Sequence, residues 1–231
     1  ALVAGTQLVQ KYREGAWQPY AKDELVDVLV QDMLATPPYV RISRMIRAIR
    51  ATDILVGNNH TNLRQIVEQE LTSEDVANRV QEIRFREINQ QQVRAAELTL
   101  QDFTYTTAVS DEHFLQWVTA DNKIAGFCRL SLPHWDKLTS GVCDVAANEL
   151  LVQPGQAMIR ELHVYGQALS LGSEGMSAQH QGLGQKLLAK ASSIAAHAGY
   201  TSLNVISSIG TRAYYRAQGF NDAGLYQQKA L

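Results

Sequence analysis

A chain of 231 residues, 45% of them hydrophobic, can bury one large core or two small ones, and a formal net charge of −2 excludes a uniformly basic nucleic-acid-binding surface. The two cysteines, Cys128 and Cys143, form neither a CxxC pair nor a His/Cys cluster, so the sequence predicts no metal site and no disulfide framework. No apolar run approaches the roughly 20 residues of a bilayer span, and we expect a cytoplasmic protein with no membrane partner.

Residues 1–91 are predicted to form a small mixed α/β linker domain. The expected helices cover residues 6–13, 22–35 and 61–71. In residues 22–35, apolar side chains recur at three- or four-residue spacing, and Pro37-Pro38 ends the helix. Polar and apolar residues alternate over 82–88, which predicts a strand. The glutamine run at 90–92 indicates the boundary with a second domain over residues 92–231.

A basic series follows Pro37-Pro38 at three-residue intervals and consists of Arg41, Arg44, Arg47 and Arg50. No acidic residue lies between Pro37 and Thr52. The spacing predicts that these side chains share one helical face.

Residues 92–231 are predicted to fold as an α+β domain. Strands are expected over residues 97–108, 112–119, 124–132, 157–165, 201–207 and 225–230. Helices are expected over residues 182–197 and 210–218, closed by Gly199 and Gly219, and residues 133–156 are expected to be loop. The order is a β-meander followed by β-α-β-α-β, which favours a parallel strand pair around the long helix.

A glycine-rich segment, Gln179-His180-Gln181-Gly182-Leu183-Gly184, follows a predicted strand and opens the long helix. Glycines let a backbone approach a phosphate closely, and the first turn of a helix offers unpaired N–H donors and positive dipole charge. Together these features predict an anion site. A turn that merely packs strand against helix fits the segment about equally well.

The sequence Tyr215-Arg-Ala-Gln-Gly219-Phe220 resembles the YxxxGF signature of the GNAT acetyltransferase superfamily. The resemblance implies that Gln179 to Gly184 hold the pyrophosphate of acetyl-CoA. It also implies that Tyr215 lies near the thioester sulfur and protonates the leaving thiolate, and it places Tyr214 in the same cofactor site. The alternative is that both tyrosines are core aromatic residues.

Leu162-His163-Val164 matches the fourth strand of the same superfamily, which implies that the backbone of Leu162 and Val164 pairs with the pantetheine arm. Alternating side chains place Glu161, His163 and Tyr165 on one face. A carboxylate or imidazole there can act as general base, so Glu161 and His163 are the candidates. A solvated or hydrogen-bonded structural pair is the alternative.

The resemblance extends to the family of the Elongator catalytic subunit, which modifies tRNA uridine. It rests on segments in the same order: Pro37–Arg44, Asn62–Gln65, Arg84–Ile88, Ile159–Gly166, Gln179–Gly184, Val205–Ser207 and Tyr214–Arg216. The resemblance implies a tRNA-stimulated, acetyl-CoA-hydrolysing acetyltransferase part of an enzyme that carboxymethylates C5 of the wobble uridine.

In that family, an iron–sulfur cluster and S-adenosylmethionine belong to a radical domain whose cysteine triad is not among these residues. We therefore expect a separate or deleted radical domain as partner, and no radical step by this chain alone. The family's basic linker positions imply tRNA contacts by Arg41, Arg44, Arg47 and Arg64. The alternative is that the arginines pair with acidic residues of the radical domain.

Two other functions remain open at this point. One is an ordinary GNAT N-acetyltransferase of protein lysine or a small amine. The other is a non-catalytic tRNA-binding homologue with a vestigial CoA pocket.

Overall fold

The computed structural model describes residues 1–46, 49–89, 91, 93–139, 152–165 and 182–231. Packing divides the chain into two compact units, Ala1–Arg86 and Glu87–Leu231, which we call the N-terminal and C-terminal units. The domain boundary expected at residue 91 stays a prediction, because the glutamine run includes residues outside the described ranges.

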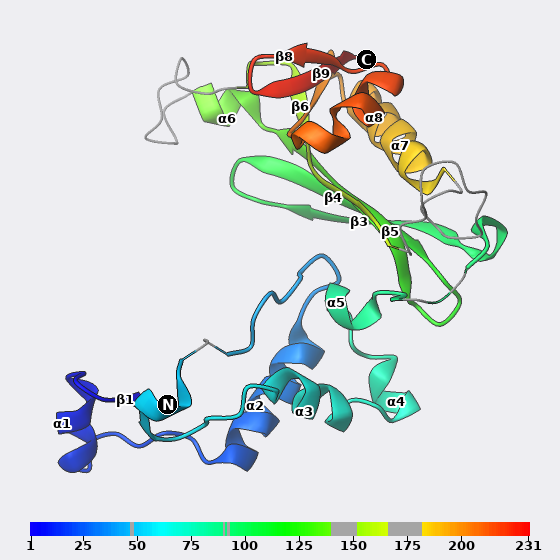
Figure 1. The fold of residues 1–231 in the computed structure, drawn as a ribbon. Helices are drawn as coiled ribbons and strands as arrows, with labels where there is room; N and C mark the ends of the chain where they lie inside the picture. Colours follow the sequence, from blue (N-terminus) through cyan, green and yellow to red (C-terminus); the bar gives the residue numbers. More distant parts are fainter. Residues whose placement is uncertain (47–48, 90, 92, 140–151, 166–181) are drawn as a thin grey trace. The chain divides into compact units, whose positions relative to one another are not determined.

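The N-terminal unit combines short helices with one small strand pair (Figure 1). Its elements are β1 (Leu2–Val3), α1 (Leu8–Arg13), α2 (Lys22–Ala35), a 3₁₀ turn at Ala51–Asp53, β2 (Ile54–Val56), α3 (Leu63–Glu70), α4 (Glu74–Ala77) and α5 (Ile83–Arg86). The two strands pair antiparallel. The core lies between α2 and α3, where Met33 and Val67 are fully buried.

The three predicted helices of this unit are confirmed as α1, α2 and α3. Helix α2 begins after Ala21, whose amide donates to the Glu24 carboxylate at 2.8 Å. It ends at Thr36, where the Pro37-Pro38 pair prevents continuation.

The predicted strand over residues 82–88 is wrong, because Ile83–Arg86 form the one-turn helix α5. The buried Glu82 carboxylate accepts the Phe85 amide at 2.8 Å, as a capping residue does at the start of a helix. The same carboxylate accepts the Ile42 amide at 2.6 Å. A distant partner therefore decides the local conformation, and two-residue alternation cannot reveal it.

The predicted arginine-bearing helix is also wrong for the described residues, because residues 39–46 and 49–50 lie in no helix. Here the Ile42 amide donates to Glu82 and the Ile42 carbonyl accepts Arg64 Nη1 at 3.0 Å. The Ile83 amide donates to the Val40 carbonyl at 3.1 Å. These backbone groups, which a helix would pair internally, are therefore bound by distant residues. Arg47 lies outside the described residues.

The C-terminal unit is built on a seven-stranded sheet of order β3-β4-β5-β6-β7-β9-β8. Its strands are β3 (Thr99–Thr106), β4 (Ser110–Val118), β5 (Ile124–Pro133), β6 (Gln156–Val164), β7 (Ser202–Val205), β8 (Asn221–Ala223) and β9 (Tyr226–Ala230). Its helices are α6 (Trp135–Thr139), α7 (Leu183–His197) and α8 (Arg212–Ala217), with 3₁₀ turns at Ala95–Glu97 and Ile209–Thr211. The β6–β7 pair is parallel and the other pairs are antiparallel.

One face of this sheet packs against α7 and α8 (Figure 1). Cys128, Ile159 and Leu203 of the sheet are fully buried against Leu187 and Ala191 of α7. Burying this apolar stripe fixes α7 on the sheet and thereby fixes where its N-terminus lies.

The α+β prediction is confirmed, including the parallel pair and both helix-closing glycines, Gly199 and Gly219, which have φ values of 87°. Helix α6, in the expected loop 133–156, and the short strand β8 were not predicted. In the described parts of the chain, no helix is long and apolar enough to span a bilayer.

Candidate functional site

Strand β6 separates from β7 halfway along its length. Pairing with β7 ends at Ile159, opposite Val205, whereas β6 continues to Val164. The pairing of β6 with β5 also shifts here, since Arg129 lies opposite Glu161 but Leu130 lies opposite Ile159. Arg160 is thus the extra residue of a β-bulge, and a bulge bends a strand away from its course.

A buried acidic residue holds the bulge in place. Glu112 is 3% exposed and accepts Arg160 Nη1 at 3.0 Å. Its other carboxylate oxygen accepts the hydroxyl groups of Ser110 at 2.7 Å and Ser131 at 2.5 Å. These bonds satisfy the buried charge and anchor the residue at which β6 leaves β7.

The open edge of β6 presents backbone groups. The Tyr165 amide donates to Ala125 of β5 at 2.9 Å. Because successive amides of a strand point to opposite edges, those of Leu162 and Val164 point away from β5, toward the gap beside β7. An extended ligand can therefore add to this edge as a strand does.

The start of α7 lies beside this edge. Gly182 has a φ of 70°, a conformation that favours glycine, and the buried Leu183 and Gly184 follow it in the first turn. Trp117 Nε1 donates to the Leu183 carbonyl at 3.3 Å and so ties the helix start to β4. The predicted phosphate contacts of Gln179, His180 and Gln181 lie outside the described residues.

The two tyrosines border the same cleft, which has a volume of about 450 Å³. Its lining consists of Leu162, Val164, Gly182, Gly184, Gln185, Thr211, Tyr214, Tyr215 and Gln218. A Cβ atom on Gly184 would lie 2.7 Å from the Tyr214 hydroxyl and 3.5 Å from Val164 Cγ2. Glycine therefore keeps this corner of the cleft open without any shift of the Tyr214 side chain.

Tyr215 is more deeply buried than Tyr214, with 6% against 39% of its surface exposed. Its ring packs edge-on against Phe220 at 5.6 Å and against Tyr214 at 5.3 Å. Burial, with smaller contributions from the Cys128 thiol and Tyr214, raises the pKa of Tyr215 to about 12. The hydroxyl is protonated at neutral pH, as that of an exposed tyrosine is, and the ring belongs to the core.

Glu161 and His163 lie on the opposite face of β6 from the cleft. Glu161 Oε2 accepts Arg129 Nε at 2.8 Å, and the Arg129 guanidinium lies 5.1 Å above the Phe114 ring. His163 is exposed and stacks on Phe127, with 5.9 Å between ring centroids and 13° between planes. The predicted trio of Glu161, His163 and Tyr215 is therefore divided between two faces of the sheet.

Sequence reasoning missed Arg129 and Trp117, which hold Glu161 and the start of α7. Neither residue lies in a recognisable motif. Their partners are 32 and 66 residues away in the chain. The strand register reveals these contacts, and no local pattern does.

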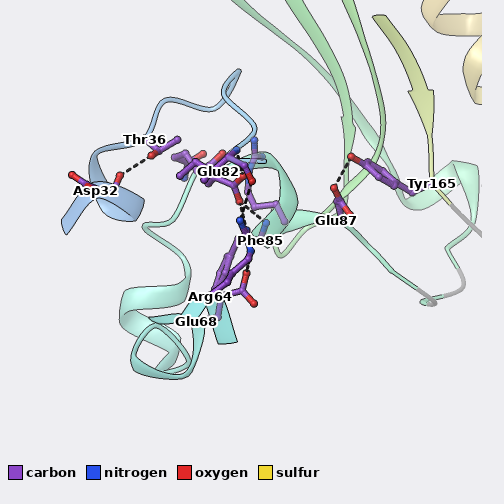
Figure 2. A network of polar contacts seen from close by, with 11 residues as sticks. Asp32, Thr36, Arg64, Glu68, Glu82, Phe85, Glu87 and Tyr165 are labelled. Atoms are coloured by element: carbon purple, nitrogen blue, oxygen red, sulfur yellow. Dashed lines mark hydrogen bonds and ion pairs between the residues drawn. The ribbon is translucent and has the colours of Figure 1, made fainter. Parts of the chain in front are cut away.

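The arginines predicted to contact tRNA differ in their environments. Arg41 and Arg44 are exposed, and Arg44 borders a cleft of the N-terminal unit. Arg64 is instead enclosed in a polar network (Figure 2), with a side chain 15% exposed. Its Nε contacts Glu68 at 2.6 Å, and its Nη2 contacts the fully buried Glu82 at 2.9 Å. This geometry gives Arg64 a structural role within its own unit.

No cluster of three or more His, Cys, Asp or Glu side chains suited to a metal ion occurs among the described residues. Cys128 is buried as a free thiol, and burial raises its pKa to about 12. Cys143 lies outside the described residues.

Comparison with known families identifies the class of protein. The profile of the Acetyltransferase (GNAT) family matches residues 77–220, and that of the Radical_SAM C-terminal domain matches residues 1–73. The chain belongs to the GNAT acetyltransferase family, and its C-terminal unit has that family's acyltransferase fold.

The resemblance to the Elongator catalytic subunit is confirmed over the whole chain. The chain is 37% identical to the tRNA uridine(34) acetyltransferase of Dehalococcoides mccartyi, covering 49% of it, and 30% identical to Elongator complex protein 3 of Danio rerio, covering 41%. The structure of archaeal Methanocaldococcus infernus Elp3 with an N-terminal deletion matches 99% of this chain and 53% of its own, with a TM-score of 0.81 and 27% identity. The chain thus spans about half the length of these relatives.

Proposed function

We propose that this chain is the acetyl-CoA-hydrolysing, tRNA-stimulated part of an enzyme that modifies the wobble uridine of tRNA. The observation that carries the proposal is the convergence of three features in one cleft: the open β6 edge, the glycine-lined start of α7, and the Tyr215 hydroxyl. The name of the Dehalococcoides relative, a tRNA uridine(34) acetyltransferase, supports the choice of acceptor.

Each feature suits one part of acetyl-CoA. The first-turn amides of α7 and its positive dipole end favour the pyrophosphate, and Gly182 and Gly184 let it approach the backbone. The outward amides of Leu162 and Val164 suit the amide groups of the pantetheine arm. The thioester then lies near Tyr215, at the other wall of the cleft.

The division of polar groups between two faces suits thioester hydrolysis. Water attacks the acetyl carbonyl carbon from the open face and gives its proton to a base there. The C–S bond breaks, and Tyr215 donates its proton to the thiolate sulfur, so that acetate and CoA are formed. Because β6 and β7 are separated beyond Ile159, groups on both faces can reach one thioester in the gap.

His163 suits the role of base better than Glu161 does. Glu161 is engaged by Arg129 at 2.8 Å. No hydrogen bond to the imidazole of His163 occurs within the described part of the chain, and the ring is exposed on the acceptor face. A ring nitrogen of His163 is therefore open to an incoming water molecule or nucleobase group.

Release of free thiol from acetyl-CoA, measured with and without tRNA, tests the proposal. We expect slow release by the chain alone and faster release with tRNA. Transfer of labelled acetyl to lysine or a small amine without tRNA would instead identify an N-acetyltransferase. Tight tRNA binding with no thiol release in either arm would identify a non-catalytic homologue.

The Tyr215→Phe substitution should lower kcat for thiol release by roughly 10²–10⁴-fold, because the leaving thiolate loses its proton donor. The KM for acetyl-CoA should stay close to that of the unmodified chain, since the ring and its packing remain. Steady-state kinetics across acetyl-CoA concentrations measures both constants.

Tyr214→Phe serves as the matched control, because it removes the hydroxyl of the neighbouring tyrosine, which borders the same cleft. We expect this variant to change KM more than kcat. Equal losses of kcat in the two variants would contradict the assignment of Tyr215 as proton donor.

We infer that Arg41 and Arg44 contribute to tRNA binding, with Arg47 as a further candidate. An arginine that neutralises one phosphate releases counterions, so Arg44→Glu should weaken tRNA binding and reduce the salt slope by about 1. Filter binding across salt concentrations measures the slope. Lys190→Glu, at an exposed position of α7, makes the same charge change and should leave binding nearly unaltered. Equal affinity for tRNA in both variants would favour the alternative, in which the arginines pair with another protein domain.

A further inference from the structure

The chain enters the C-terminal unit beside the start of β5. Glu87 forms an isolated parallel bridge with Ile124, and the Ile88 amide donates to the Ile124 carbonyl at 3.1 Å. Ile88 is 3% exposed and packs with Ala125 and Leu183. The backbone at Glu87 is therefore held beside β5 by a single bridge.

The side chain of Glu87 reaches the end of β6. Its Oε1 accepts the Tyr165 hydroxyl at 3.0 Å, a contact between residues 78 positions apart (Figure 2). The Tyr165 backbone is fixed in turn by its amide, which donates to the Ala125 carbonyl at 2.9 Å. The tyrosine is thus held at both ends, and its ring has little freedom to rotate.

The ring of Tyr165 lies against His163. Their centroids are 4.5 Å apart and their planes are inclined by 46°. The imidazole also stacks on Phe127, which is fully buried and whose centroid lies 6.2 Å from that of Tyr165. Of these two neighbours, Phe127 is fixed by burial, and Tyr165 is fixed by packing and, at its hydroxyl, by the bond to Glu87.

We propose that Glu87 is a positioning residue that orients the His163 imidazole through the hydroxyl and ring of Tyr165. The proposal deepens the proposed function, because it rests on His163 acting at the acceptor face. Side chains that act on a substrate need neighbours that lock their rotamers. Glu87 supplies such a lock from a segment that sequence spacing does not connect with the site.

Three substitutions separate positioning from mere folding. Tyr165→Phe removes only the hydroxyl and Glu87→Ala removes its acceptor, so we expect each to lower kcat for thiol release about tenfold at unchanged KM. Glu87→Gln keeps an acceptor oxygen and should retain most of the activity. In a His163→Gln background, Glu87→Ala should have no further effect. A full additional tenfold loss in that background would overturn the proposal.

A second measurement does not depend on turnover. In the isotope-labelled full chain, the imidazole signals of His163, identified by their loss in His163→Gln, report the ring's surroundings. Glu87→Ala and Tyr165→Phe should shift these signals alike, and Glu87→Gln should shift them least. Signals in Glu87→Ala identical to those of the unmodified chain would overturn the positioning role. Shifted signals in a chain with no thiol release would uphold it and reject the proposed function alone.

Discussion

Gly184→Asp should abolish acetyl-CoA binding, with a loss in affinity of at least roughly 100-fold. The new side chain fills a corner in which even its Cβ atom would lie only 2.7 Å from the Tyr214 hydroxyl in its present position. It also places a carboxylate in the first turn of α7, where the pyrophosphate is expected. Like charges brought together at an interface cost several kcal/mol, and every ~1.4 kcal/mol changes affinity tenfold. Isothermal titration with acetyl-CoA measures the loss.

Gly184→Asn is the matched control, because asparagine has nearly the same shape without the charge. We expect it to weaken binding less than aspartate does, since the Tyr214 hydroxyl at the end of a half-exposed side chain can yield to the added volume. The difference in acetyl-CoA affinity between the two variants gives the electrostatic contribution to the loss of binding. Unchanged affinity for acetyl-CoA in Gly184→Asp would show that the pyrophosphate does not bind at this position.

Glu82→Ala should destabilise the N-terminal unit by about 3–5 kcal/mol, the usual cost of removing one partner from a buried ion pair. Glu82 is fully buried and holds three groups together: the Ile42 amide, the Phe85 amide and Arg64 Nη2 (Figure 2). Its loss removes the acceptor of two backbone amides and of one guanidinium nitrogen, Arg64 Nη2. Hydrogen exchange of the α3 amides, for instance that of Val67, measures the opening free energy of this unit.

Glu68→Ala provides the comparison, because Glu68 pairs with the same arginine but its side chain is 33% exposed. We expect that variant to lose less than about 1 kcal/mol, as exposed pairs do. Similar losses in the two variants would show that Glu82 is not the residue that organises the segment after Pro38.

Local patterns were enough to predict elements whose own side chains determine them. The predicted range 22–35 coincides with α2, and the predicted helix 182–197 begins one residue before α7. In both, an apolar stripe meets a core and a recognisable residue ends the helix. The same holds for the β-meander, where alternating residues bury one face of each strand.

The two incorrect predictions share one physical cause. Residues 39–46 and 82–88 have regular local spacing, but Glu82 binds backbone groups of both segments. The bond to Ile42 joins residues 40 positions apart, and together with the Phe85 bond it outweighs the weak preferences of short segments. Residues 82–88, whose polar and apolar residues alternate, therefore contain a single helical turn and no strand.

The candidate site was predictable in its parts and not in their arrangement. One cleft is lined by Leu162, Val164, Gly182, Gly184 and the two tyrosines. The faces of the β6 residues could be assigned from alternation along β6 itself. The bulge at Arg160, the end of β7 pairing at Ile159 and the contacts of Arg129 depend on register between strands. Only the fold shows that Tyr215 and His163 lie on opposite faces of the sheet, on either side of the gap between β6 and β7.

Amide hydrogen exchange with and without acetyl-CoA tests the central claim most directly, that acetyl-CoA binds between β6, α7 and α8. We predict slower exchange at the amides of Leu162 and Val164, which point into the gap beside β7, and in the first turn of α7. Exchange in the N-terminal cleft around Arg44 and His60 should be unchanged. Protection confined to that N-terminal cleft, or absent at Leu162 and Val164 under saturating acetyl-CoA, would contradict the site.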